Sequence, residues 1–243
     1  MDTTYKELQL GNCKVVPREL DLKDALKIAR IHEFQNERRL TQFVNFVTGV
    51  PDLGLILSDQ ERYYILLEYL NANRDNLLST DFDYSKHLLP RKGEWKTSVV
   101  VDDLTVNQLT GAHLELIESQ SEGPQDWLLG TMLIRSQLNT WEPLPSEPTA
   151  KLLEALIKRI TLFEALPQSQ ADDFRIKYMS ATRQLTYFLE TGTGEHGIVV
   201  YGGADDAPAR FLTSATFGII AKQLERYFAN ANPSPNARRT NDI

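Results

Sequence analysis

Apolar residues recur along most of this chain at the spacing of an α-helix with one buried face. Runs with the i, i+3, i+4, i+7 pattern begin at Leu22, Leu40, Tyr63 and Leu153, and a related run consists of Leu109, Ala112, Leu116 and Ile117. Each run predicts a helix that packs one stripe of side chains against a core. Because these runs fill much of the chain, we expect roughly half of the residues to be helical, above the usual proportion of about a third.

Two of these helices carry clear end signals. Ser58 followed by Glu61 forms an S-x-x-E capping box, which satisfies two backbone N–H groups of the first turn. The helix that starts there is expected to run to about Asn73. The preceding helix should end at Gly49, two residues before Pro51, because glycine accepts the left-handed conformation and proline does not continue a helix.

Two stretches of the chain share one plan, a β-branched run that leads into a helix start. They span residues 15–24 and 99–108. In each, an N-cap candidate, Asp21 or Thr105, is followed three residues later by a carboxylate or amide that can reach back to the backbone of the cap. We therefore predict two strand-to-helix corners, the second with its helix running from Thr105 onward.

A proline-rich segment divides the chain. A helix that opens at Gly123 is expected to run through Leu138 and to give way to residues 141–148, where three prolines fall within six residues. Proline fixes its own φ and keeps the preceding residue out of the helical region, so this segment is expected to be a stiff, extended connector. We predict one domain over residues 1–140 and a second over residues 149–229.

The second predicted domain begins with helices, and the spacing of its apolar residues then changes from that of a helix to that of a strand. Its first helix should stop at Pro167, and Ser169 should cap a shorter helix that follows. Residues 184–190 and 197–201 are β-rich runs on either side of a glycine-rich segment. This arrangement predicts an antiparallel hairpin with a glycine-rich loop.

The end of the chain contains three further predicted features. Residues 210–212 form a short β-rich run that would add an edge strand, and residues 230–243 lose their apolar content and are expected to form a flexible tail. Between them a last helix is expected to carry Ile219, Ile220, Leu224 and Tyr227. The fold class is therefore predicted to be α+β and mainly helical, with short strands leading into helices and a C-terminal antiparallel hairpin.

Composition narrows the classes of function. A single cysteine, Cys13, excludes a disulfide within one chain and fits a reducing compartment. A formal net charge of −7 and scattered basic residues argue against nucleic acid as a partner. The longest apolar runs fall far short of the roughly 18 residues that a membrane span needs, so we expect no membrane partner and no signal peptide.

The four histidines show no metal-ligand or catalytic spacing. His32-Glu33 begins like the H-E-x-x-H motif, but Asn36 occupies the position of the second histidine. His113 falls on the apolar face of a predicted helix, where a hydrogen-bonded core histidine is expected. We therefore expect no catalytic residue, no metal site and no cofactor.

Two other groups of residues are candidates for a site. The glycines of residues 192–194 resemble part of a phosphate loop, but a strand and not a helix should follow them, so nucleotide binding is not expected. The acidic pairs 102–103 and 205–206 are interpreted as solvated charges in turns, because adjacent carboxylates in a turn point in different directions.

The tryptophans are the remaining candidates for a site. Trp95 stands just before a predicted strand and Trp141 stands in the proline-rich segment, where a large ring can stay half exposed. Tryptophan dominates many protein interfaces, so both are predicted interface residues. The alternative for each is that its ring seals a loop onto its own domain. Trp127 lies at helical spacing with Ile134 and is assigned to the core.

Three segments carry a resemblance to a known group of proteins. They are residues 14–26, a strand entering a helix with an acidic cap, residues 126–130 at a helix start, and residues 208–211 beside the hairpin. In this order they resemble small assembly proteins of long-tailed bacteriophages, particularly the T-even-type baseplate hub subunits and tail-assembly chaperones. The chain lacks the metal-binding cysteines of some hub components, which puts a cluster-binding role in doubt.

The resemblance implies a non-enzymatic structural or assembly protein of a bacteriophage tail or baseplate. Its expected partners are tail tube, tape measure or hub subunits, with self-association through the same surfaces. Its expected location is the virion tail, or the host cytoplasm during assembly. Two alternatives stay open: an adaptor module of the host cytoplasm, and an enzyme whose site is assembled between the two halves, which an enclosed polar pocket with perturbed carboxylates would favour.

Overall fold

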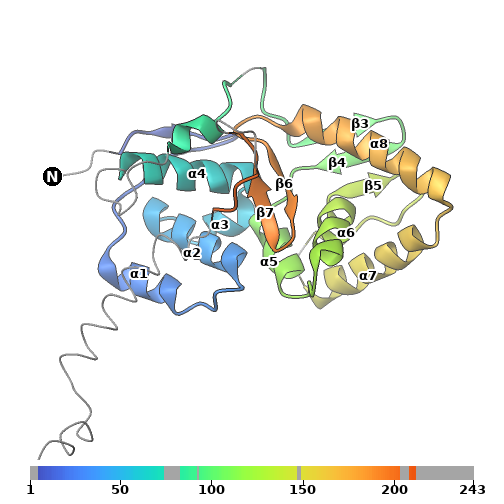
Figure 1. Cartoon of the computed structure of the whole chain (residues 1–243), viewed down its shortest axis with the longest axis horizontal. Coiled ribbons are helices and arrows are strands. Elements are labelled where there is room, and N and C mark those ends of the chain that lie inside the picture. Colours follow the sequence, from blue (N-terminus) through green and yellow to red (C-terminus); the bar gives the residue numbers. More distant parts are fainter. Residues whose placement is uncertain (1–4, 74–82, 92, 147–148, 203–207, 212–243) are drawn as a thin grey trace, which may run out of the picture.

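The computed structural model describes residues 5–73, 83–91, 93–146, 149–202 and 208–211, and these are α+β and mainly helical, as predicted (Figure 1). The helices are α1 (Leu22–Ala29), α2 (Asn36–Thr48), α3 (Leu53–Ile56), α4 (Asp59–Ala72), α5 (Gly111–Glu118), α6 (Pro124–Ile134), α7 (Ala150–Glu164) and α8 (Gln168–Leu185). The strands are β1 (Leu8–Gln9), β2 (Lys14–Val15), β3 (Ser98–Val101), β4 (Leu104–Asn107), β5 (Ser136–Leu138), β6 (Thr191–Gly194) and β7 (Gly197–Val200).

Helices occupy one end of the molecule and a small covered sheet occupies the other. Helices α1 to α4 gather at the first end, while the antiparallel sheet β3-β4-β5 lies at the second end with α8 packed on β3 and β4 (Figure 1). Helices α5 and α6 lie between the ends, and α7 packs on α6. The hairpin β6–β7 lies against α6, so the described chain returns from the sheet end to the middle of the molecule.

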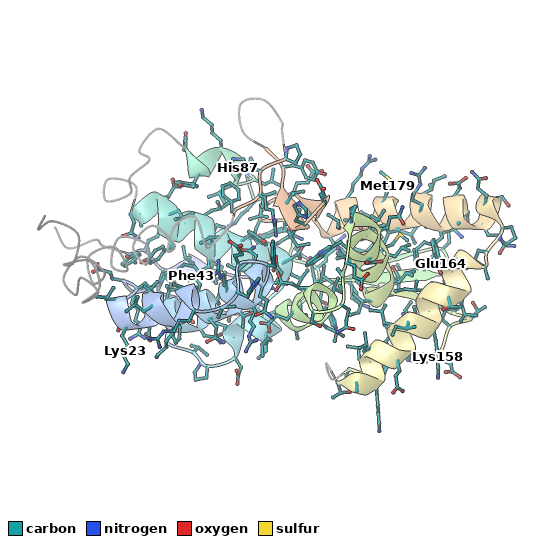
Figure 2. All side chains as sticks on the ribbon, turned by 60° about the horizontal axis from the view of Figure 1, so that its bottom comes forward. Lys23, Phe43, His87, Lys158, Glu164 and Met179 are labelled. Carbon is teal, nitrogen blue, oxygen red and sulfur yellow. The ribbon has the colours of Figure 1, made fainter. Side chains whose placement is uncertain are left out.

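One contiguous cluster of buried apolar side chains passes through both ends. It includes Phe43 of α2, which Figure 2 labels inside the helical end, and Leu104 and Val106 of β4. It also includes Leu156 of α7 and other residues beyond the proline-rich segment. The division of the chain into domains at that segment stays a prediction, and the packing on its two sides is continuous.

Several helix ends lie where the sequence places them. Ser58 and Glu61 form the full capping box at the start of α4, and Gly49 ends α2 with a φ of 69°. The Asp21 side chain accepts a hydrogen bond from the backbone N–H of Asp24 at 2.9 Å, which caps α1. These three predictions are confirmed. Each depends only on residues within one helical turn of each other, so a short stretch of sequence contains the information that it needs.

The prediction of a second strand-to-helix corner is wrong, because residues 98–107 form the hairpin β3–β4. Asp102 adopts a φ of 54° in its turn, and helix α5 begins only at Gly111, with Thr110 as its N-cap. Leu104 and Val106 are buried and alternate with more exposed neighbours, which is the period of a strand. The β-branched alternation outweighs the capping pattern at Thr105.

Two helix boundaries in the sheet region also differ from the predictions. Helix α6 ends at Ile134, and residues as far as Leu138 form strand β5, which pairs with β4. Helix α8 is long, starts after Pro167 without a cap from Ser169, and extends to Leu185. Pairing with distant segments decides both boundaries, and local sequence does not contain that information.

The C-terminal hairpin is confirmed, with strand β6 falling inside the predicted loop. Its turn lies at residues 195–196, and Gly197 has a φ of 125°. The Tyr201 ring covers Gly192 of β6. A Cβ on Gly192 would lie only 2.6 Å from this ring, so the close contact requires glycine at this position. Ala209 makes an isolated bridge to Val200, whereas the predicted last helix and tail lie outside the described residues.

Candidate protein-binding site

Both predicted interface tryptophans lie against their own chain. The Trp95 ring covers Gly11 so closely that a Cβ there would lie 2.2 Å from its Nε1, and its centroid lies 5.2 Å from that of Phe188. The Trp141 ring is tilted against that of Phe174, with 5.6 Å between the two ring centroids. Each ring is half-buried at the edge of the core, so contact with a partner stays a prediction for both.

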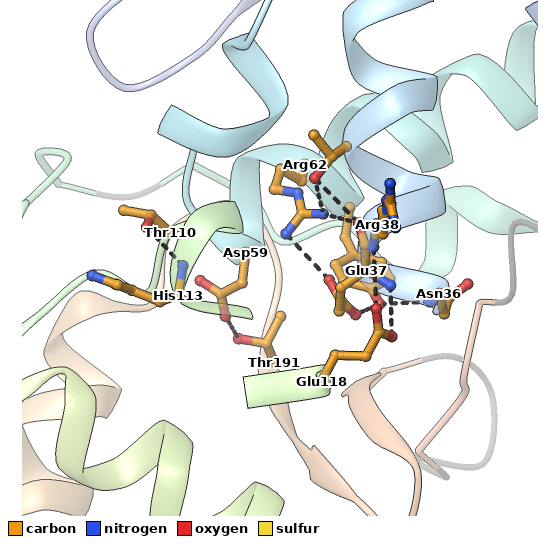
Figure 3. A network of polar contacts seen from close by, with 11 residues as sticks. Asn36, Glu37, Arg38, Asp59, Arg62, Thr110, His113, Glu118 and Thr191 are labelled. Atoms are coloured by element: carbon orange, nitrogen blue, oxygen red, sulfur yellow. Dashed lines mark hydrogen bonds and ion pairs between the residues drawn. The ribbon is translucent and has the colours of Figure 1, made fainter. Parts of the chain in front are cut away.

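A buried ion pair joins α4 to α2 at the helical end (Figure 3). The Arg62 side chain is fully buried, and its Nη1 lies 3.2 Å from Oε2 of Glu37. Arg62 Nη2 donates to the backbone oxygen of Glu37 at 2.6 Å and to Oγ1 of Thr41 at 3.1 Å. Tyr63 donates its hydroxyl to Oε1 of Glu37 at 2.8 Å. Burial raises the pKa of Glu37, while Arg62 and Tyr63 lower it.

A second carboxylate, from α5, caps the N-terminus of α2. Glu118 accepts hydrogen bonds from the backbone N–H groups of Glu37 at 2.9 Å and Arg38 at 3.2 Å. Gln35, the N-cap residue, makes no side-chain cap of its own, so Glu118 supplies what α2 lacks. Burial, together with the neighbouring charge of Glu37, raises the pKa of Glu118 to about 7.

Further buried polar groups connect α4 to the C-terminal part of the chain. Thr191 of β6 donates to Oδ2 of Asp59 at 2.6 Å (Figure 3). The amides of Gln60 and Gln108 both donate to the backbone oxygen of Leu185, at 3.0 and 2.9 Å, and so satisfy the last turn of α8. These contacts position elements relative to one another, whereas the buried Oδ1 of Asp59 has no hydrogen-bond partner among the described residues.

An open polar pocket of about 310 Å³ lies beside Glu118. Residues from both predicted domains line it, among them Phe34, Glu118 and Trp127 from the first and His196 and Arg210 from the second. Its lining contains the carboxylates of Glu118, Glu122 and Glu195, together with Arg210. In the described residues, no group of three or more histidine, cysteine or acidic side chains is arranged to hold a metal ion.

Two core assignments from the sequence have different outcomes. Trp127 is buried, as predicted. His113 is half-buried, but its Nδ1 is buried and has no hydrogen-bond partner among the described residues, so the expectation of a hydrogen-bonded core histidine is wrong for this atom. Burial, with Arg135 nearby, lowers the pKa of His113. The side chain therefore favours its neutral form.

An apolar groove of about 210 Å³ lies between α5, α6 and α7. Helix α6 approaches α5 closely at Gly130, where a Cβ would lie only 3.1 Å from the Ile117 side chain. Gln120, Asp126 and Glu164 contribute polar groups to the lining. The apolar side chains that line the groove without being buried are Leu116, Leu129, Leu153, Ile157 and Ile160.

The groove coincides with the stripe that the sequence assigned to the core face of α7. Of that stripe, Leu156 is buried, whereas the Ile157 side chain is 54% exposed. The buried face of α7 is turned to one side and uses Leu152 and Arg159 instead. The periodicity therefore identified a real apolar face, and what it did not reveal is that the described chain leaves this face open.

Other exposed apolar side chains lie at the same end of the molecule. Ile176 and Met179 are exposed on α8, and Figure 2 labels Met179 there together with Glu164 on α7. Leu162 is 61% exposed on α7 but does not line the groove. Single exposed apolar side chains are common on protein surfaces, so the groove, with several of them together, is the stronger candidate for binding.

Comparisons with known proteins provide no relative for this chain. No family model, no curated protein and no solved structure matches it. Within the described part of the chain, every helix is too short or too polar to cross a membrane.

Proposed function

We propose that the protein acts by binding other proteins, as a non-enzymatic structural or assembly component of a bacteriophage tail or baseplate. The groove between α5, α6 and α7 is its contact site, and an amphipathic helix of a tail tube, tape measure or hub subunit is the partner. The observation that supports this proposal is the open apolar stripe of α7, centred on Ile157. An apolar groove of this kind accepts a helix through side chains spaced three and four residues apart.

Groove variants test the proposal when the protein is co-expressed with the products of neighbouring genes. Ile157→Asp places a charge in the groove, and we expect about a tenfold or greater loss of affinity for the partner, because a buried aliphatic side chain contributes about 1.5–3 kcal/mol. Leu162→Asp is the matched control, because Leu162 lies on the same helix outside the groove. Equal binding by both variants would contradict the groove, and binding to no tail protein would contradict the assignment to a tail.

The predicted tryptophan contacts have a separate test. Replacement of Trp95 and Trp141 by Phe keeps a ring in each packed position and removes the indole N–H and part of the area. We expect weaker association with the same partner if either ring contacts it. Unchanged affinity in a folded double variant would assign both rings to packing within the chain.

The second candidate function is an enzyme with its site in the polar pocket. The supporting observation is that this pocket unites Glu118, whose pKa is raised to about 7, with Arg210 from the other side of the proline-rich segment. A carboxyl group that titrates near neutrality suits general acid–base catalysis. A substrate screen that detects turnover by the native protein, with loss of turnover in Glu118→Gln, would favour the enzyme. Absence of turnover in both proteins would favour the binding function.

A further inference from the structure

The sheet β3-β4-β5 has two edges, and the chain itself closes the edge at β5. The backbone oxygen of Ser136 faces away from β4 and accepts a hydrogen bond from Arg159 Nη1 at 2.6 Å. The backbone oxygen of Leu138 accepts from the Gln137 side chain at 2.8 Å and from the backbone N–H of Trp141 at 3.0 Å. Another strand cannot pair here without displacing these donors.

The edge at β3, the outer strand in Figure 1, has open backbone groups. Gln108 donates its backbone N–H to the oxygen of Thr97 at 2.8 Å, so the backbone groups of Thr97 face β4. Hydrogen bonds alternate along an antiparallel pair, so Ser98 and Val100 direct their N–H and C=O groups away from β4. No hydrogen bond joins these groups to any other residue that the structure describes. Such an edge is a template for a further strand.

The side chains of β3 leave this edge accessible. Ser98 is exposed, and the Val100 side chain is 66% exposed. Residues 98–101 include no proline and no charged residue, and three of the four are valines. Proline and charged side chains are devices that prevent pairing at an edge, whereas β-branched side chains favour it.

The charges on either side of β3 suit a second copy of the same chain. Lys96 precedes the strand and Asp102 follows it, and both are exposed without an ion pair in the described part of the chain. Asp103, by contrast, pairs with Lys177 at 2.9 Å. Two antiparallel β3 strands would place Lys96 beside Asp102 of the partner subunit, and two-fold symmetry would repeat this pair. Two parallel strands would bring like charges together.

One register of this antiparallel arrangement uses every open group. With Val99 on the two-fold axis, Ser98 lies opposite Val100 of the partner subunit, and symmetry supplies the reverse pair. Each of these pairs exchanges two N–H···O=C hydrogen bonds. A shift by two residues in either direction would place Ser98 or Val100 opposite a residue outside the strand.

We propose that the protein forms a dimer in which β3 pairs antiparallel with β3 of the partner subunit, in the register centred on Val99. The dimer joins two three-stranded sheets across a two-fold axis. None of the residues that line the groove between α5, α6 and α7 belongs to β3, so the dimer does not depend on the proposed function.

Sedimentation of the full-length protein tests the dimer over about 1–500 μM, the range in which a small interface associates. Val100→Pro removes an outward N–H that β4 does not use, and proline is tolerated in this position of an edge strand. We expect the dissociation constant of the dimer to rise about tenfold or more, because each subunit loses one donor to its partner. Val100→Thr keeps both the N–H and the β-branched shape and should dimerise like the native protein.

A native protein that stays monomeric over the whole range would overturn the proposal. Equal dimerisation of folded Val100→Pro and Val100→Thr would overturn it as well, because the dimer would then not use β3.

Disulfide formation between two variants tests the register. Ser98→Cys and Val100→Cys are prepared separately in a Cys13→Ser background, mixed and mildly oxidised. Directly opposite residues of a hydrogen-bonded pair have Cα atoms about 5.5 Å apart, within the range of a disulfide, whereas diagonal neighbours are about 7–8 Å apart. We therefore expect the mixed disulfide to exceed either disulfide between like variants, as measured by mass spectrometry. Like disulfides in equal or greater amount would overturn the register.

Charge variants test the role of the strand ends at low salt. Lys96→Glu places a carboxylate beside Asp102 of the partner subunit and should weaken the dimer about fivefold. Addition of Asp102→Asn removes this repulsion and should restore part of the affinity. Asparagine also accepts the positive φ of this position, which is 54°. A dimer unaffected by Lys96→Glu would overturn the antiparallel arrangement.

A groove variant separates the dimer from the proposed function. Ile157→Asp should lose the helical partner and still dimerise like the native protein, because Ile157 lines the groove and not the edge. Val100→Pro should lose the dimer and keep the groove open to a partner. Loss of the dimer in folded Ile157→Asp would assign self-association to the groove and overturn the pairing through β3.

Discussion

The two ends of this molecule are each stabilised by a buried arginine, but the two arginines find their partners by different means. Arg62 at the helical end is paired with the carboxylate of Glu37. Arg159 at the sheet end has no carboxylate partner among the described residues. It donates to the backbone oxygens of Ser136 at 2.6 Å and Glu142 at 2.6 Å, and the Trp141 ring lies 4.9 Å from its guanidinium carbon. The first arrangement depends on a second charge, and the second depends on the paths of two backbone segments.

The difference shows how each end can fail. At the helical end, removal of one charged partner leaves the other charge buried, which costs more than the pair itself contributes. At the sheet end, loss of the guanidinium leaves neutral carbonyl groups without donors, which costs less. Burial lowers the pKa of Arg159 to about 10.

The largest expected effect is at the ion pair. Arg62→Met should reduce the free energy of unfolding by about 3–5 kcal/mol, because Glu37 then stays buried without its counter-charge. The double variant Glu37→Leu/Arg62→Met should recover most of that loss. Urea unfolding of the three proteins checks both statements. A double variant as unstable as Arg62→Met would mean that the hydrogen bonds around the pair matter more than its charges.

The next largest effect is a pH dependence of the free energy of unfolding, which we expect to come from Glu118 at the helical end. The pKa of Glu118 is about 7 in the folded protein and has a usual value of 4.5, so the folded state holds this proton more tightly. The stability that Glu118 contributes is present below about pH 4.5 and is lost as the pH rises through about 7. The upper limit of the change is about 3 kcal/mol, from about 1.36 kcal/mol for each unit.

Unfolding measured between pH 5 and pH 8 tests this dependence. Glu118→Gln should flatten the profile over this range and leave the part that comes from Glu37, whose pKa is also raised. Arg159→Met should keep the slope of the native protein, because the pKa of the guanidinium that it removes, about 10, lies above the range and methionine has no titratable group. A slope unchanged by Glu118→Gln would remove this carboxyl group as its source.

A smaller loss is expected at the sheet end. Arg159→Lys keeps the charge but loses the planar fork that reaches four acceptors on α6, on β5 and on the segment after β5. We expect a loss of about 2 kcal/mol in the free energy of unfolding, less than for Arg62→Met, since no charge is left unpaired. If Arg159→Lys were the more damaging change, the contrast between the two ends would be reversed.

Local patterns in the sequence were enough to predict the helix ends but not the contacts between elements. The capping box at Ser58 and the stop at Gly49 lie within single turns, and both are confirmed. Thr105 carries a similar capping pattern but lies in a strand, because its cross-strand neighbours Val100 and Gln137 are set by pairing. Propensity within a short window does not report such pairing.

The candidate site depends on still longer distances in the sequence. Glu118 accepts a hydrogen bond from the backbone N–H of Glu37, 81 residues earlier in the chain, and nothing near either residue signals the contact. The stripe on α7 was visible in the sequence, whereas its exposure depends on where α5 and α6 lie. An apolar period shows that a face prefers burial, and only the packed structure shows whether the neighbouring helices cover it.

The smallest expected effect is at the cap of α4, which lies beside the ion pair. Ser58→Ala should cost about 0.5–2 kcal/mol, because it leaves the backbone N–H of Glu61 without its acceptor. Ser58 is buried, so water does not replace the lost bond and the value should fall toward the upper limit. Ser58→Thr keeps the hydroxyl and is the matched control. A change within error of zero for Ser58→Ala in reversible urea unfolding would mean that the helical end is held by its buried charges and not by its local cap.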